Sequence, residues 1–170
     1  VLPGLGQRRL VVSIMRHVKR DVSVYFLTIT AINAGLGVAV GLAMWGFGMP
    51  APILWGVIAA TFNFAPFLGA IAGVGLAGLT AMMHFDEVGY ALLVPVTYYA
   101  LTTLAGSFVT PMILGERLVL NPVVIFLSLI FWGWIWGIPG IFLAVPIMSS
   151  IKIVCDQIPT LRKIGVFLGR

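Results

Sequence analysis

The sequence predicts an all-α protein that crosses a membrane several times, and three observations support this. Of the 170 residues, 61% are hydrophobic and 9% are charged, whereas soluble domains carry about 25% charged residues. No Asp, Glu, Lys or Arg lies between residues 22 and 85, a stretch long enough for more than one spanning helix. Five of the ten Lys and Arg residues precede residue 22 and four follow Ile151, which is typical of the cytoplasmic flanks of membrane spans.

Residues 1–21 are expected to form a basic amphipathic helix in the lipid headgroup region. Val11, Ile14 and Val18 share one helical face, and basic side chains such as Arg16 share the opposite one. A helix of this kind beside a membrane lies along its surface. Binding to nucleic acid or to a calmodulin-like protein is the less favoured alternative, so we expect membrane lipid as a partner and no nucleic acid.

The transmembrane domain is expected over residues 22–154, with its first three spans at about 22–46, 51–65 and 67–83. As one continuous helix, the apolar stretch 51–83 would measure roughly 50 Å, which exceeds one crossing and falls short of two. Pro66 interrupts this stretch, because proline has no amide hydrogen to donate within a helix. We therefore expect a re-entrant hairpin or two short helices here.

The remaining spans are expected at about 88–109, 122–137 and 139–154. Pro95 should kink the first of them, and the polar connection that follows should run from 110 to 122. Residues 123–151 are again too long for one crossing, and they break at WGWIWGIPG, which contains Gly137 and Pro139. Residues 155–170 are expected to be a basic cytoplasmic tail.

Charge then predicts the topology. With residues 1–21 in the cytoplasm, all ten Lys and Arg residues face inward, and Asp86 and Glu87 face outward. One span followed by a broken hairpin then occurs twice, first in residues 22–83 and again in residues 88–154. The second copy enters the membrane from the opposite side to the first. Inverted repeats with paired Gly/Pro-interrupted segments are a recurring plan of secondary transporters. The predicted fold class is an all-α polytopic membrane protein with two Pro/Gly-broken helical hairpins in a possible inverted repeat.

Motifs for catalysis or for cofactor binding carry little weight here. GVGLAG (73–78) matches a dinucleotide-binding fingerprint, but no strand precedes it and it lies in an apolar helix. Its glycines indicate close helix packing instead. Cys155, His17 and His84 have no partners spaced for a disulfide or a metal site. We expect no enzyme, no catalytic residue, no metal and no cofactor.

Candidates for a transport path lie at the two breaks and in the connection near the inner face. A broken helix leaves backbone N–H and C=O groups free to meet cargo, and Asn63 is the side chain most expected to contact it. For Glu116 and Arg117, the alternative to a role in the transport path is that they form a solvated pair in a loop. At least one tryptophan of WGWIW should face lipid or a partner subunit, which allows a homo-oligomer. The candidates are Asn63, Pro66, Gly69, Glu116, Arg117, Asn121, Pro122, Gly137, Pro139 and Gly140.

Two blocks of sequence resemble the C-terminal half of the AI-2E family transporters. They are LWGVIAATFNFAPFLGAIAG (54–73) and TPMILGERLVLNPVVIFLSLIFWGWIWGIPGIFLAVPIMSSIK (110–152), and the resemblance covers nearly all of the chain. The family often has isoleucine and tyrosine where this chain has Ala65 and Phe67. The family's proteins are longer, and the sequence has neither an initial methionine nor a signal peptide. We therefore expect a membrane-embedded N-terminal half outside this sequence.

The resemblance implies a permease of the bacterial inner membrane without a known cofactor. The family is named for export of the quorum-sensing signal autoinducer-2, and the spans carry no charge, so the leading hypothesis is transport of a small polar solute. Sodium/proton antiport is an alternative, and it needs a carboxylate, for which Glu116 is the only inner-face candidate in this sequence. A scaffold role without transport is the third hypothesis.

Overall fold

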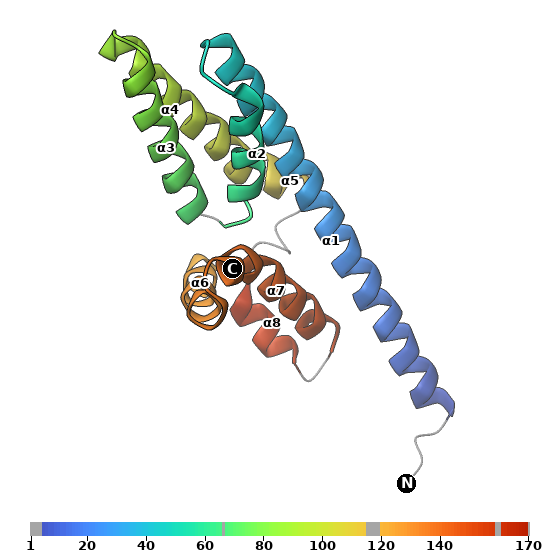
Figure 1. The fold of residues 1–170 in the computed structure, drawn as a ribbon. Coiled ribbons are helices and arrows are strands. Elements are labelled where there is room, and N and C mark those ends of the chain that lie inside the picture. Colours follow the sequence, from blue (N-terminus) through green and yellow to red (C-terminus); the bar gives the residue numbers. More distant parts are fainter. Residues whose placement is uncertain (1–4, 66, 115–119, 159–160, 170) are drawn as a thin grey trace.

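The structure, a computed structural model, describes residues 5–65, 67–114, 120–158 and 161–169, without the side chains of residues 5–15, 17, 157 and 162. Within these ranges the regular structure is helical throughout (Figure 1). The elements, in chain order, are α1 (Leu5–Gly46), α2 (Pro52–Phe62), α3 (Leu68–His84), α4 (Val88–Leu104), the π-helix η1 (Ala105–Val109), α5 (Thr110–Leu114), α6 (Pro122–Trp136), α7 (Ile138–Gln157) and α8 (Arg162–Leu168).

Three segments are long and apolar enough to cross a membrane, namely Val18–Gly46, Val88–Leu114 and Ile138–Asp156. The helices α2, α3 and α6 are shorter and also apolar. The predicted all-α polytopic membrane fold is therefore confirmed. Both predicted breaks are present, one between α2 and α3 and the other at Gly137.

Helix α1 differs from its prediction because it has no break near residue 21. It runs for 42 residues, from Leu5 to Gly46, and so joins the expected surface helix to the first span. The sequence between Gly6 and Gly35 contains neither proline nor glycine, and these are the residues that most often end or kink a helix. The basic segment is thus a direct extension of a spanning helix.

The predicted connection 110–122 is wrong at its beginning, because residues 110–114 are helical. Helices α4 and α5 are joined through η1 into one apolar segment, Val88–Leu114. At the end of η1, the backbone N–H of Thr110 donates to the carbonyl of Ala105, five residues earlier. This wider turn comes directly before Pro111. The ring of a proline clashes with the carbonyl four residues earlier in a regular α-helix, and we attribute the local widening to this clash.

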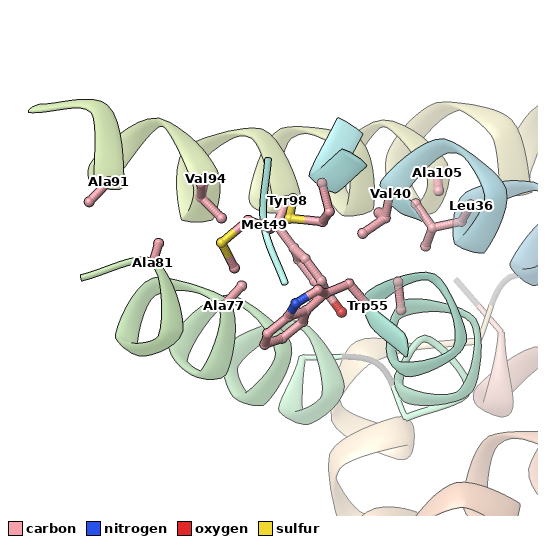
Figure 2. Close-up of a cluster of buried hydrophobic side chains, with 12 residues drawn as sticks. Leu36, Val40, Met49, Trp55, Ala77, Ala81, Ala91, Val94, Tyr98 and Ala105 are labelled. Atoms are coloured by element: carbon pink, nitrogen blue, oxygen red, sulfur yellow. The ribbon is translucent and has the colours of Figure 1, made fainter. Parts of the chain in front are cut away.

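The largest buried cluster lies among α1, α2, α3 and α4 (Figure 2). Helix α2 packs mainly on α1, and α3 mainly on α4. Gly37 of α1 and Gly56 of α2 let the two backbones approach, because a Cβ at either position would lie 2.6 Å from the other residue's carbonyl oxygen. The buried side chains between α3 and α4 include Ala77 and the fully buried Tyr98. In GVGLAG, Gly73 faces the ring of Tyr98 and Gly78 lies against Pro95, as the predicted packing role requires, whereas a Cβ at Gly75 would meet nothing within 4 Å.

The C-terminal helices form a second group. Helix α6 packs on α7, and α8 folds back on α7, so residues 162–168 of the predicted tail are a packed helix. Leu168 is buried with Val124 and Cys155. Lys152, near the end of α7, is 5% exposed and pairs with Asp156 at 2.7 Å.

The two ends of the broken element α2–α3 lie at the same end of the molecule. Phe47, in the turn before α2, packs its ring on that of Tyr90 at the beginning of α4 at 5.8 Å, and Tyr90 packs in turn on Phe85, directly after α3, at 5.0 Å. The N-terminus of α1 lies at the opposite end (Figure 1). Residues 52–84 therefore enter and leave on one side, as a re-entrant element does.

The two breaks resemble each other in sequence but not in packing. In the first, α2 and α3 each pair with a different neighbour, whereas α6 and α7 pair with each other. Both interruptions are thus present, but the two units do not share one packing pattern, and the inverted repeat stays a prediction.

Candidate functional site

The first break occupies the residues between α2 and α3. Asn63 ends α2 with helical dihedral angles, and Phe67 precedes α3 with φ 64° and ψ −59°. Positive φ is uncommon for a residue with a Cβ, and this combination lies in the strained γ-turn region. Strained backbone of this kind persists where surrounding structure enforces it, and it clusters at functional sites.

Asn63 is tied to α1 by a side-chain hydrogen bond. Its Nδ2 donates to Oδ1 of Asn33 at 2.7 Å, and Asn33 is 1% exposed. Asn33 lies roughly 20 Å from the end of α1, taking about 1.5 Å per residue, so the break lies well within the length of the spanning helix. Polar side chains at such depth are costly unless they find partners, and each of these two provides one for the other.

A cavity of about 450 Å³ lies beside this break. Its wall is formed by α1, the residues of the first break, the beginning of α3, the segment α4–η1–α5, the beginning of α6 and the middle of α7. None of the described lining residues is charged. The polar ones are Tyr25, Asn63, Tyr99, Thr102, Thr103, Ser107, Thr110 and Ser149.

Three of the hydroxyl groups in the wall already donate hydrogen bonds. Thr102 and Thr110 donate to carbonyls of their own helix, and Ser149 of α7 donates to the hydroxyl of Tyr25 on α1 at 2.9 Å. These groups stabilise the wall and have only acceptor capacity left. The bond from Ser149 also joins α7 to α1 across one side of the cavity.

Other polar groups of the wall have donors or acceptors to spare. The hydroxyls of Tyr99, Thr103 and Ser107 make no hydrogen bond within the described part of the chain, and the hydroxyl of Tyr25 accepts one and donates none there. Hydroxyls of this kind can donate to and accept from a solute. The cavity can therefore hold a neutral polar molecule, and its volume lies within the usual range of small-molecule sites.

Two of the predicted path residues, Asn63 and Pro122, line this cavity. Asn121 instead caps α6, because its Oδ1 accepts from the backbone N–H of Val123 at 2.9 Å. Gly69 lies in α3 and faces the backbone carbonyl of Phe62. These two residues shape the elements around the cavity without lining it.

The second break does not contribute to the cavity. Gly137 has φ 65° and ψ −142°, and both it and Pro139 are exposed. Gly140 is buried against the carbonyl of Trp132. All three are absent from the cavity wall, so they serve the α6–α7 turn. Pro66, Glu116 and Arg117 lie outside the described residues.

Most of the polar wall comes from residues that are not among the predicted candidates. The segment α4–η1–α5 supplies Tyr99, Thr103, Ser107 and Thr110, whose spacing of three or four places them along one helical face. This spacing is visible in the sequence, although a hydropathy profile does not separate hydroxyls that line a space from those that bond their own helix.

Comparison with known proteins gives one family. A model described as "AI-2E family transporter" matches residues 5–160. The AI-2 transport protein TqsA of Escherichia coli (strain K12) is 31% identical over 173 residues, which cover 99% of this chain and 50% of TqsA. The "Putative transport protein YrrI" of Bacillus subtilis (strain 168) is 37% identical over 119 residues, which cover 70% of this chain and 33% of that protein.

A further relative, a "Putative transport protein" of Borreliella burgdorferi, is 32% identical over 136 residues, which cover 79% of this chain and 37% of that protein. The chain thus spans half or less of the length of each of these curated relatives.

Proposed function

The chain belongs to the AI-2E transporter family, and from this premise we propose that it moves a small neutral polar solute, such as autoinducer-2, through the cavity beside Asn63. Its relatives are named transport proteins or putative transport proteins, and three of its helical segments are long and apolar enough to cross a membrane. The whole protein's cargo, its direction of transport and its place in the bacterial inner membrane are part of the proposal.

The observation that carries the proposal is the composition of the cavity wall. It combines hydroxyl and amide groups with apolar surface, and its described residues carry no charge. A neutral solute with several hydroxyl groups can replace its water contacts with such a wall. A bare cation would need carboxylate or several carbonyl oxygens to offset its dehydration.

The proposed transport step is alternating access around the first break. Cargo binds where α2 ends and where η1 widens the helix, since both places interrupt the regular backbone and π-turns are frequent at functional sites. With the basic end of α1 in the cytoplasm, the cavity lies between the break and the cytoplasmic end, and export is the direction that we propose because the family is named for export of autoinducer-2.

Two other functions remain as competitors in the test. Sodium/proton antiport would place a carboxylate on the path, with Glu116 as the inner-face candidate. A scaffold role would need no aqueous path at all. In either case autoinducer-2 would not move.

The test is entrance counterflow with the full-length protein in proteoliposomes. Vesicles are preloaded with unlabelled autoinducer-2, and entry of a labelled trace is followed without an ion gradient, so the result does not depend on the driving force. We expect transient accumulation of the label. Sodium-dependent proton movement without any counterflow would replace the proposal with antiport, and neither activity would favour the scaffold role.

A further inference from the structure

We propose that Asn33 is a positioning residue that holds the side-chain amide of Asn63 against the cavity, so that the amide is already ordered when cargo binds. This inference rests on the proposed function, because it concerns how the same cavity recognises its cargo. Asn33 does not line the cavity, and it acts only through Asn63.

The direction of the amide–amide hydrogen bond is the first step. Nδ2 of Asn63 donates to Oδ1 of Asn33 at 2.7 Å. Turning over the Asn33 amide alone would bring two amino groups face to face, which cannot form a hydrogen bond. With its amino group directed toward α1, Asn63 keeps Oδ1 without a partner in the described residues. The side chain lines the cavity and offers an acceptor to cargo.

The second step is the unused donor on Asn33. Its Nδ2 is buried and has no hydrogen-bond partner among the described residues. An unpaired buried amino group is unfavourable, and more so than an unpaired carbonyl oxygen. Turning over both amides would let this group donate to Oδ1 of Asn63, and the Asn63 amino group would then face the cavity.

The pair therefore has two arrangements with opposite polarity toward the cavity. The arrangement in the structure leaves the donor of Asn33 unsatisfied and keeps the acceptor of Asn63 free. In either arrangement Asn33 holds the Asn63 amide in place and leaves one of its polar atoms free for cargo. Ser128 illustrates the contrast, because its hydroxyl donates to the carbonyl of Ala144 at 3.2 Å within the α6–α7 hairpin, and neither residue lines the cavity.

The experiment is a double-mutant cycle on counterflow of autoinducer-2 by the full-length protein. Asn33→Leu and Asn63→Leu each remove the amide at similar volume, and the double variant completes the cycle. Each single change is expected to raise KM about three- to tenfold with a smaller effect on the maximal rate, the range that corresponds to one hydrogen bond. The double variant should be no worse than Asn63→Leu, because both changes remove the same contact.

Two further variants separate positioning from structure. Asn33→Asp keeps an acceptor for Asn63 and should give a KM closer to that of the parent than Asn33→Leu does, with lower stability because a carboxyl group replaces an amide at a position that is 1% exposed. Ser128→Ala removes a buried interhelical bond elsewhere and should leave KM unchanged. If Asn33→Leu does not fold, as judged by size-exclusion chromatography, Asn33→Ser replaces it, because the shorter hydroxyl does not reach Asn63.

The outcomes distinguish this inference from the proposed function. Counterflow by the parent protein, with KM raised by Asn63→Leu but not by the Asn33 variants, would overturn the positioning role alone. Additive effects in the double variant would do the same. No counterflow by the parent would overturn the proposed function and the positioning role together.

Discussion

The two broken elements share a sequence pattern and differ in what the break does. In the first, α2 and α3 separate and pack on different partners, and Asn63 at the break lines a cavity. In the second, α6 and α7 pack on each other across Gly137, and no residue of that break reaches the cavity wall. A proline or glycine in an apolar helix thus produces a turn but not by itself a binding site. A candidate site also needs a polar side chain that lines a cavity, as Asn63 does.

This comparison predicts a separation of effects. Changes at the second break should lower stability and leave KM unchanged, and polar changes around the first break should alter KM and leave stability nearly unchanged. The predictions below test that separation, beginning with the largest expected effect.

Gly140→Val should destabilise the protein most. A Cβ at Gly140 would overlap the backbone carbonyl of Trp132 and lie 3.1 Å from Cβ of Trp136, and overpacking of this kind costs about 3 kcal/mol. The apparent Tm in detergent should fall while KM for autoinducer-2 stays the same. Gly75→Ala is the control, because a Cβ there meets nothing within 4 Å. An unchanged Tm for Gly140→Val would show that the hairpin is not close-packed.

Gly137→Ala should have the next largest effect. The backbone at Gly137 has φ 65° and ψ −142°, which is strained for any residue with a Cβ and costs about 2 kcal/mol. We expect a lower Tm and unchanged KM in the counterflow assay. A raised KM would instead connect the second break to cargo binding and would remove the distinction between the two breaks.

Phe67→Gly should raise stability, by about 1 kcal/mol, because glycine adopts positive φ without strain. Phe67 has φ 64° and lines the cavity. Ala51→Gly is the matched variant, since Ala51 also has positive φ, 50°, but lies in the turn before α2. Both changes should raise Tm, and only Phe67→Gly should alter transport. A lower Tm for Phe67→Gly would mean that its ring contributes more than its backbone strain removes.

Ser107→Ala should give the smallest effect, a rise in KM of about twofold from the loss of one exposed hydroxyl contact. Ser107 lines the cavity. Ser150→Ala is the control, because the hydroxyl of Ser150 donates to the carbonyl of Pro146 within α7 at 2.8 Å and lies outside the cavity wall. Equal KM values for the two variants would argue against a contact between Ser107 and cargo.

Much of the fold could be predicted because lipid imposes simple rules on sequence. Length and hydropathy place some helices within a residue or two, as for the predicted span 67–83 and the observed α3 (Leu68–His84). The re-entrant break follows from the same arithmetic, since 33 apolar residues are too long for one crossing and too short for two. Asn63 could be chosen because an amide at such depth is costly without a purpose.

The rest could not be predicted because it depends on which helices meet. Hydropathy does not show that α2 pairs with α1 and α3 with α4, and a proline such as Pro111 predicts an interruption where the helix instead widens by a π-turn. The place of Ser107 and its neighbours in the cavity wall could not be predicted for a similar reason. The sequence does not distinguish a hydroxyl that faces a cavity from one that bonds the backbone of its own helix.

The central claim is that the first break borders a water-accessible cargo cavity and the second does not. It is tested most directly by thiol labelling of Ser107→Cys and Ile138→Cys, each in a Cys155→Ser background of the full-length protein. Ser107 lines the cavity, and Ile138, beside Gly137, is 71% exposed on the apolar outer surface. A small membrane-impermeant reagent should modify the first and not the second, and autoinducer-2 should slow the modification. Labelling at Ile138 with none at Ser107, or labelling of Ser107 that autoinducer-2 does not slow, would contradict the account.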